Sequence, residues 1–313
     1  MEKLNDANGS TVIEVEDLRK NFGDLQAVDG ITFNIEKGEI FGILGPNGAG
    51  KTTTMEIIVG LQQKSSGNVR VLGRDPGKDN GWLKQKIGVQ LQTVNLFARL
   101  TVKETLALFA GFYHHPLEVK TVIDMLELDK KKNDWISNLS GGQLKRVAVG
   151  NAIIGNGDIL FLDEPTAGLD PQSKQRVWSI INDLKAKGKT IFLATHFMEE
   201  AQELCDRVCI IDYGKIIEMD KPYHLIKKYF KETAIEFNVP LEELKEKIEH
   251  FAQVSRVNIV KDSTTIYTTD ILSTISQLLD LCQQDEKALK NFRIRESNLE
   301  DVFLKITGRS IRE

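Results

Sequence analysis

A short glycine-rich stretch, residues 45–53, has the residue types and the spacing of a phosphate-binding loop. Its members in order are Gly45, Pro46, Asn47, Gly48, Ala49, Gly50, Lys51, Thr52 and Thr53. The glycines let the backbone bend until its N–H groups point at one centre, and a following helix adds positive potential there. Lys51 supplies a movable cation for the outer phosphates of a nucleotide, and the Thr52 hydroxyl can ligate Mg²⁺. The stretch therefore predicts a nucleotide phosphate site.

Two acidic residues, Asp163 and Glu164, end a second apolar stretch at residues 159–162. Such a run is typical of a buried parallel strand, and carboxylates at its C-terminal end face the ligand crevice of an α/β sheet. Asp163 can hold Mg²⁺, directly or through water, and Glu164 is placed to polarise a water molecule. A solvated acidic turn is the alternative interpretation of this pair.

His196 and the Ser-Gly-Gly of residues 140–142 are further candidates for chemistry. A histidine at a strand end is more often structural, but the strand predicted at residues 190–194 is expected to neighbour the strand of Asp163, which favours a chemical role. Ser140 is a typical helix N-cap, and the glycines expose N–H groups where a helix begins. This helix start can bind an anion, although the same residues also occur in ordinary loops.

The elements that must position these residues predict an α/β core. An apolar strand at residues 39–44 precedes the phosphate loop, and a helix at residues 52–61 follows it. Residues 102–139 have a helical pattern that is broken at residues 114–116, so a helical insert follows the phosphate loop. Further strands are predicted at residues 11–18 (as an edge-type strand), 31–35, 69–73, 87–91, 208–212 and 215–219, with helices at residues 173–187 and 199–206.

The pattern changes after Lys231, where a second domain is predicted. Its strands and helices alternate in the order β-α-β-β-α-β-α, which is typical of a small α+β domain with ferredoxin-like order. The strands are expected at residues 233–238, 254–260, 264–268 and 289–294, and the helices at residues 241–251, 271–282 and 299–306. This part contains no glycine-rich loop and no cluster of acids or histidines.

Composition agrees with a soluble globular protein of two domains. The chain has 313 residues, of which 41% are hydrophobic and 27% charged, with a net charge of -4. The negative balance argues against a broad nucleic-acid surface, and no apolar run approaches the ~18 residues that cross a bilayer. Residues 1–10 are polar and are expected to form a flexible tail. The three cysteines (Cys205, Cys209 and Cys282) give no disulfide framework, and buried free thiols are expected.

Residues 139–143, Leu-Ser-Gly-Gly-Gln, resemble the signature motif of the nucleotide-binding subunits of ABC transporters. The resemblance extends over roughly residues 12–226 and implies a P-loop NTPase core with a mixed sheet and a helical insert. It implies an ATP-binding domain over residues 11–231, with the helical subdomain at about residues 93–157. Residues 232–313 then form the accessory α+β domain, as a dimer-contact or regulatory module.

Other positions resemble the family pattern in the family's order. Phe22 resembles the adenine-stacking aromatic, where Tyr is more usual; from residue type alone, packing under a turn is the favoured alternative. Gln92 resembles the glutamine that coordinates Mg²⁺ and senses the membrane partner. Gln90 is a neighbouring candidate, but its distance along the sequence from Ile87 and Gly88 fits the family pattern less well. Asp170 belongs to a segment that resembles the D-loop, and His196 resembles the switch histidine.

The resemblance also implies ATP and Mg²⁺ as cofactors and a homodimer that assembles head to tail. Each ATP then lies between one phosphate loop and residues 140–143 of the partner, so that Ser140, Gly141, Gly142 and Gln143 complete the other copy's site. Glu164 orients and deprotonates the water that attacks the γ-phosphate. Lys51, His196 and Mg²⁺ neutralise the developing charge.

Two further segments narrow the resemblance to drug- and polysaccharide-exporter ATPases, namely residues 192–201 and residues 295–304. Export is therefore expected. The subunit is expected to lie on the cytoplasmic face of the cell membrane, where it docks peripherally on a separate integral-membrane permease. No binding of nucleic acid is expected. The family places that contact around the Gln92 segment, where an apolar rim is expected; packing inside the helical insert is the alternative. The rim residues are Val94, Leu96, Phe97 and Leu100.

Two other functions remain open from the sequence. A soluble, non-transport ABC ATPase acting on ribosomes or DNA would carry duplicated cassettes, long coiled coils or basic arms, whereas this chain has a single cassette and an acidic balance. A nucleotide-dependent regulator without useful turnover would not need both Glu164 and His196. Hydrolysis coupled to export is therefore the main hypothesis.

Overall fold

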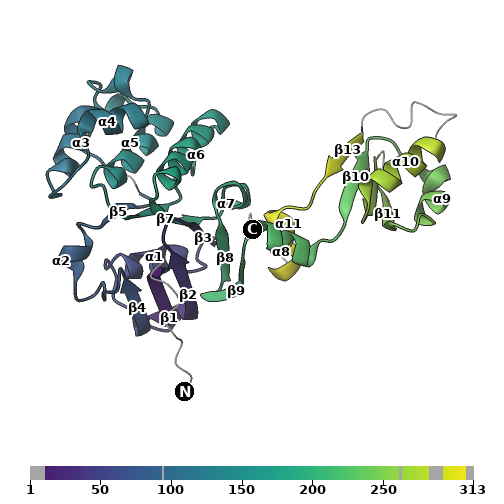
Figure 1. Ribbon diagram of the computed structural model, residues 1–313, viewed down its shortest axis with the longest axis horizontal. Coiled ribbons are helices and arrows are strands. Elements are labelled where there is room, and N and C mark those ends of the chain that lie inside the picture. Colours follow the sequence, from purple (N-terminus) through teal and green to yellow (C-terminus); the bar gives the residue numbers. More distant parts are fainter. Residues whose placement is uncertain (1–10, 94, 261–262, 282–291, 308–313) are drawn as a thin grey trace. The chain divides into compact units, whose positions relative to one another are not determined.

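The structure, a computed structural model, describes residues 11–93, 95–260, 263–281 and 292–307 (Figure 1). The tail expected at residues 1–10 lies outside this range, as do Val94 and Cys282. Contacts between Cα atoms divide the chain into two units, one ending at Pro222 and one beginning at Tyr223. The division falls ahead of the domain boundary expected after residue 231.

A mixed six-stranded sheet forms the centre of the first unit, with the strand order β5-β6-β7-β3-β8-β9. All neighbouring pairs are parallel except β8 with β9. Because β6, β7 and β3 are neighbours, the loops that leave their C-terminal ends meet at one edge of the sheet. The predicted pairing of the Asp163 strand with the strand before His196 is confirmed. The strands are β3 (Ile40–Leu44), β5 (Ile87–Gln90), β6 (Ile159–Asp163), β7 (Thr190–Thr195), β8 (Arg207–Asp212) and β9 (Lys215–Asp220).

A second, antiparallel sheet has the order β2-β1-β4, formed by β1 (Thr11–Phe22), β2 (Leu25–Glu36) and β4 (Ser66–Val71). The edge position expected for residues 11–18 is wrong, because β1 lies in the middle: Val15 pairs with Phe33 on one side and with Val69 on the other. Alternating burial shows that one face of a strand is covered, but it does not report how many neighbours the strand has.

Helix α1 (Lys51–Ile58) shares one buried core with both sheets, which fixes the phosphate loop that precedes it. Met55 of α1 belongs to the same cluster as Phe33 of the antiparallel sheet and Phe161 of the mixed sheet. Helix α7 (Met198–Leu204) packs on β3 and β7, and α6 (Pro171–Ala186) contacts α7 and α5 (Gly141–Ile153). Both faces of the central strands are thereby covered, as their continuous apolar sequences require.

The helical insert contains α3 (Val102–Ala110), α4 (Val119–Met125) and α5, which pack on one another. Helix α5 also packs on β5 and β6, so it joins the insert to the sheet. The predicted break at residues 114–116 is present, and its side chains are exposed. Short elements complete this unit: α2 (Asn80–Leu83) and the 3₁₀ turns Asp129–Lys131 and Ile136–Asn138.

The second unit is built on a four-stranded antiparallel sheet with the order β11-β12-β10-β13 and has its own core. The predicted order of elements is present in the described residues. The helix expected at residues 241–251 shortens to a 3₁₀ turn, Glu242–Leu244, and α9 (Lys245–Glu249), and the Leu241 amide ahead of them donates to Thr264 Oγ1 at 2.9 Å. Helix α8 was not predicted. The remaining elements are α8 (Pro222–Tyr229), β10 (Thr233–Phe237), β11 (Val254–Val260), β12 (Ser263–Thr268), α10 (Ile271–Leu281), β13 (Phe292–Arg295) and α11 (Leu299–Thr307).

Candidate nucleotide site

The loop between β3 and α1 borders a cavity of about 370 Å³. Glycine is needed at Gly50, where φ is 102° and an added Cβ would lie 2.4 Å from the Ala27 carbonyl oxygen. Gly48 also has a left-handed φ of 81°, but it faces open space. The lining residues are Phe22, Leu25, Ala27, Asn47, Gly48, Gly50, Lys51, Thr52, Thr53, Gln92 and Glu164.

Lys51 places a cation in the wall of this cavity. Its side chain is 6% exposed, and its ammonium donates to the carbonyl oxygens of Gly45 at 2.8 Å and of Pro46 at 3.0 Å. Burial lowers the pKa of Lys51, and the charges of Glu164 and Asp163 oppose that shift. An ammonium enclosed in this way can reach the phosphates of a bound nucleotide with little loss of solvation.

Thr52 and Asp163 form a pair of oxygen ligands beside the loop. The Thr52 hydroxyl donates to Asp163 Oδ2 at 2.9 Å, and Asp163 is completely buried. Asp163 Oδ1 has no hydrogen-bond partner among the described residues, and burial raises the pKa of Asp163 while the Thr52 bond opposes that shift. A buried carboxylate oxygen without a partner is costly, and a hard divalent cation would satisfy it. The donor set therefore fits Mg²⁺.

Glu164 and His196 come together because β6 and β7 are adjacent. Glu164 Oε2 lies 2.8 Å from His196 Nδ1, and the Glu164 side chain is only 3% exposed. Glu164 has a left-handed φ of 49°, which is strained for a residue with a Cβ, and its N–H donates to the Ala194 carbonyl at 2.9 Å. The pair can hold and pass a proton at the mouth of the phosphate loop.

The two candidate glutamines occupy different positions. Gln92 is exposed and lines the cavity with Lys51 and Thr52. Gln90 is buried at the end of β5, and its amide nitrogen donates to the Asp163 carbonyl at 3.0 Å, where it supports the strand end. Only Gln92 is placed to reach a ligand in the cavity.

Phe22 ends β1 and lines the same cavity. The residue is 45% exposed, and Lys20 Nζ lies 4.6 Å from the ring centroid. Packing under a turn would bury the ring, so that alternative does not describe its position. An exposed aromatic face at the rim can stack on a nucleotide base.

Residues 140–143 and Asp170 lie at the starts of two other helices and do not line this cavity. Ser140 Oγ accepts from the Gln143 amide at 3.3 Å, and Gln143 Oε1 accepts from the Ser140 amide at 2.9 Å, which makes a capping box for α5. Gly142 lies against α6, since an added Cβ would be 2.5 Å from Ser173 Oγ. These residues therefore lie apart from the cavity beside their own chain's phosphate loop.

Asp170 caps α6 through Ser173. The Asp170 carboxylate accepts from the Ser173 amide at 3.0 Å and from its hydroxyl at 2.6 Å. These hydrogen bonds lower the pKa of Asp170. The carboxylate is thus fixed as an anion beside the start of α5.

Lys145 and Glu200 do not line the cavity, but they contact the segments that carry Gln92 and Glu164, and both were missed from the sequence. Glu200 is completely buried on α7, and its Oε1 accepts from Thr166 Oγ1 at 2.7 Å and from Trp178 Nε1 at 3.1 Å. It joins the loop after Glu164 to α6. No spacing rule identifies a buried carboxylate of this kind. The one signal in the sequence was that Glu200 lies on the apolar face of a predicted helix, where acidic residues are rare.

Glu200 predicts a pH dependence of stability. Burial raises the pKa of Glu200, with the hydrogen bonds from Thr195, Thr166 and Trp178 opposing the shift. The unfolded carboxyl loses its proton near an ordinary pKa of about 4.3, whereas the folded protein keeps it to higher pH. Stability therefore falls as pH rises between the two pKa values. Glu200→Gln cannot ionise, so its free energy of unfolding relative to wild type should increase with pH in urea titrations.

A matched control for this prediction is Glu203→Gln, since Glu203 is exposed on the same helix. Its free energy of unfolding should run parallel to that of wild type across the pH series. If the Glu200→Gln curve is also parallel to wild type, ionisation of Glu200 is not linked to folding.

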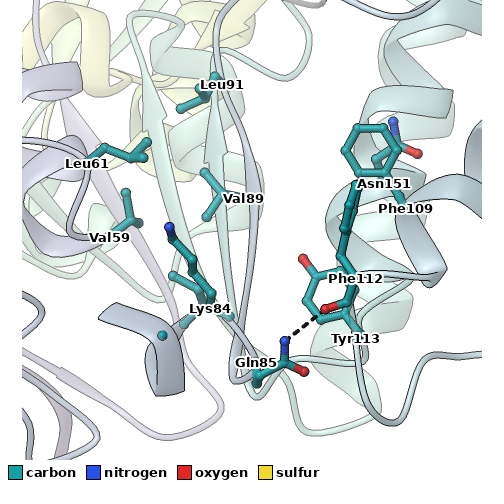
Figure 2. A pocket seen from close by; sticks show the side chains of 12 residues that line it. Val59, Leu61, Lys84, Gln85, Val89, Leu91, Phe109, Phe112, Tyr113 and Asn151 are labelled. Atoms are coloured by element: carbon teal, nitrogen blue, oxygen red, sulfur yellow. Dashed lines mark hydrogen bonds between the residues drawn. The ribbon is translucent and has the colours of Figure 1, made fainter. Parts of the chain in front are cut away.

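A second cavity, a groove of about 440 Å³, lies between the core and the helical insert. Figure 2 shows aliphatic side chains such as Leu61 and Leu91 on one side and Phe109 and Phe112 on the other. Gln85 Nε2 donates to the Phe112 carbonyl at 2.9 Å and joins the two sides. Leu61 is 54% exposed and Phe112 is 65% exposed, so the groove offers apolar surface to a partner. β5 runs along it toward Gln92.

Comparison with known proteins gives matches over nearly the whole chain. Residues 28–167 match the family described as ABC transporter. Nod factor export ATP-binding protein I of Ralstonia nicotianae is 36% identical over an alignment that covers 97% of this chain and 97% of that protein. The protein of the same name from Rhizobium leguminosarum bv. viciae is 37% identical over 308 residues, 96% of each chain.

Solved structures resemble about two thirds of the chain. An ATP-binding subunit of an ABC transporter is 26% identical, covers 70% of this chain and 93% of its own, and has a TM-score of 0.64. A dimeric, post-hydrolysis structure of an ATP-binding cassette bound to ADP and Pi is 27% identical, covers 67% of this chain and 98% of its own, and has a TM-score of 0.60.

Proposed function

The chain belongs to the family of ABC transporter ATP-binding subunits, and on this premise we propose that it hydrolyses ATP to drive export through a separate membrane permease. Its relatives over 96–97% of the chain are named for export, which favours this function over work on ribosomes or DNA. The relatives are named for the export of Nod factor, so Nod factor is the first cargo to assay for this chain.

The binding roles follow from the cavity beside the phosphate loop. The loop N–H groups and Lys51 would hold the β- and γ-phosphates, and Phe22 would stack on the adenine. Thr52, Asp163 and Gln92 would hold Mg²⁺, which neutralises phosphate charge. The orphaned Asp163 Oδ1 and the place of Gln92 in the cavity wall support this assignment.

Hydrolysis requires a base for water and a group that stabilises the transition state. Glu164 would accept the proton of the water that attacks the γ-phosphorus, and His196, held at 2.8 Å from Glu164, would orient that carboxylate and meet the developing negative charge. The convergence of Lys51, Thr52, Gln92 and Glu164 on one cavity is the observation that carries this proposal.

A second copy of the chain would complete each site. Residues 140–143 and Asp170 lie outside their own chain's cavity, so Ser140, Gly141, Gly142 and Gln143 would contact the ATP held by the partner's loop. A dimer is also described for a structurally similar cassette. Residues 232–313 would form an accessory module, and the separate core of the second unit supports that division.

The permease would dock in the groove lined by Leu61, Leu91 and Phe112. Within the described ranges, no helix is long and apolar enough to span a membrane. A short amphipathic helix of the permease fits the groove because its apolar face would cover the exposed Leu61 and Phe112 side chains. Phe97, 64% exposed beyond β5, would extend the contact, while Leu96 and Leu100 are half-buried. The subunit would then lie on the cytoplasmic face of the membrane.

Capture from membranes tests the proposed function. Glu164→Gln protein, incubated with ATP and Mg²⁺ and recovered from detergent-solubilised native membranes, should bring a polytopic membrane protein at near equal stoichiometry. Adding Phe112→Asp should lower that recovery at least about tenfold, as expected for removing an apolar anchor from an interface. ATP hydrolysis by the detergent-free Phe112→Asp subunit should be unchanged.

The matched control is Leu272→Asp, because Leu272 is an 82% exposed side chain on α10 and does not line the groove. It should leave the recovery of the membrane protein intact. Recovery of ribosomes or DNA in place of a membrane protein would contradict the export function. If the membrane protein is recovered equally with and without Phe112→Asp, the permease does not dock in this groove.

A further inference from the structure

Lys145 extends from the helical insert to the catalytic loop of the same chain. It lies on α5, the helix that residues 140–143 begin, and it is half-buried. Its ammonium donates to the Glu164 carbonyl oxygen at 3.1 Å and to the Gln92 carbonyl oxygen at 3.3 Å. One side chain therefore joins the residue proposed as general base to the residue proposed as metal ligand.

The sheet itself does not make this connection. β5 and β6 pair in parallel only as far as Gln90 and Leu162. Beyond that point the Gln90 side chain reaches the Asp163 carbonyl, but Gln92 and Glu164 have left the ladder. Lys145 connects the two diverging segments, because two of its three N–H donors bind main-chain carbonyl oxygens, one in each segment.

Glu164 depends on hydrogen bonds of this kind because its backbone is strained. A left-handed φ of 49° in a residue with a Cβ persists only where the surroundings hold it in place. Its N–H is held by the Ala194 carbonyl, and its C=O accepts from Lys145 at 3.1 Å and from the Ala167 amide at 3.2 Å. Removing the ammonium would leave this carbonyl with the neutral Ala167 amide, a donor from the same loop, and would remove its connection to α5 and to Gln92.

Burial strengthens the interaction. Burial lowers the pKa of Lys145, and the charges of Glu164, Asp163 and Glu200 oppose that shift. A partly desolvated ammonium makes stronger hydrogen bonds to carbonyl oxygens than a solvated one.

On the basis of the function proposed above, we propose that Lys145 is a positioning residue that couples Gln92 and Glu164 to α5. In the proposed dimer, the start of α5 contacts the partner's ATP, while Lys145 holds the base of its own site. Contact of residues 140–143 with the partner's nucleotide is thereby transmitted to the orientation of Glu164. Lys145 makes this link through main-chain atoms and does not touch the substrate.

Steady-state hydrolysis by the purified full chain tests the proposal. Lys145→Met keeps the length of the side chain and removes its donors, so kcat should fall about tenfold, the effect of losing a hydrogen bond to a charged group. The KM for ATP should change less than about twofold, because the phosphate loop keeps its contacts. Lys145→Arg, which retains a cation and donors, should recover kcat to within about threefold of wild type.

Lys189→Met is the matched control. Lys189 is also half-buried, and it likewise donates to two oxygens, those of Asn156 at 3.0 and 2.9 Å, but it does not line the nucleotide cavity. Its loss should leave both kcat and KM unchanged. A fall in kcat equal to that of Lys145→Met would show a general effect of removing a buried lysine and would overturn the proposal.

Hydrogen exchange provides a second measurement that does not require activity. In Lys145→Met, amides following β5 and β6 should exchange faster than in wild type, while amides of α1 should not change. If Lys145→Met changes neither the exchange nor kcat, and the wild-type protein hydrolyses ATP, the proposal for Lys145 is overturned while the proposed function stands. A wild-type protein without hydrolysis would overturn the proposed function, and the exchange pattern would still decide whether Lys145 holds the two segments.

Discussion

Glu164→Gln is expected to lower the turnover of ATP by at least about 100-fold while leaving ATP bound, because the amide cannot accept the proton of water. Glu164 is 2% exposed and contacts His196, so few other groups can replace it. The hydrogen bonds of Lys51 to the Gly45 carbonyl and of Thr52 to Asp163 do not involve Glu164 and remain in the variant, while the ion pair between Lys51 Nζ and Glu164 Oε1, at 3.8 Å, loses its negative partner. The expected result is therefore a fall in kcat with nearly unchanged affinity for ATP, measured by phosphate release and by binding of a fluorescent ATP analogue.

The same variant should accumulate ATP-bound dimers, since the nucleotide that joins two copies is not removed. Size-exclusion chromatography with and without ATP would measure this. Glu199→Gln is the matched control: it is a 70% exposed carboxylate on α7 that pairs with Lys174. A Glu164→Gln protein with near wild-type turnover would remove Glu164 from the role of general base.

Local motifs explain what could be predicted from the sequence. The phosphate loop, the two acids after β6 and the helix start at Ser140 each occupy a few consecutive residues, and their conformations are set by neighbours in the chain. The position of His196 near the end of the Asp163 strand followed from one further assumption, that two buried strands lie side by side, and its contact with Glu164 is a finding of the structure. The centre of the six-stranded sheet could be predicted as well, because β3, β6 and β7 are continuous buried runs.

Non-local contacts explain what was missed. Lys145 is one of many lysines in the sequence, and only folding brings it to the carbonyls of Gln92 and Glu164. The position of β1 in the middle of its sheet depends on pairing with β4, which lies beyond the whole phosphate-loop unit in the chain. Helix α8 is a short amphipathic helix of eight residues, and its pattern was present in the sequence but was not recognised.

The choice between two glutamines shows the limit of resemblance. Gln90 and Gln92 are two residues apart, so on a continuing strand both side chains would point to the same face. The strand ends at Gln90, and this termination separates the buried side chain from the one in the cavity. The end of an element is among the least certain features of a sequence-based prediction, because it depends on tertiary contacts.

Gly50→Ala is expected to destabilise the first unit by about 3 kcal/mol or more and to abolish ATP binding. Gly50 has a φ of 102°, and a Cβ would lie 2.4 Å from the Ala27 carbonyl oxygen, an atom of the main chain of β2. Main-chain atoms within a sheet cannot move independently, so the overlap must be relieved by shifting the start of α1. That shift would displace Lys51 and Thr52, which follow Gly50 directly. Urea unfolding in the absence of nucleotide would measure the loss of stability.

Gly48→Ala separates backbone strain from steric overlap. Gly48 has a φ of 81°, but nothing lies within 4 Å of an added Cβ, so only the strain of about 1 kcal/mol should appear in nucleotide-free unfolding. A difference of about 2 kcal/mol or more between the two variants would locate the effect at the contact between the loop and Ala27. Equal destabilisation would mean that the loop relaxes away from β2, and the geometry of the phosphate site would then depend on bound nucleotide for its order.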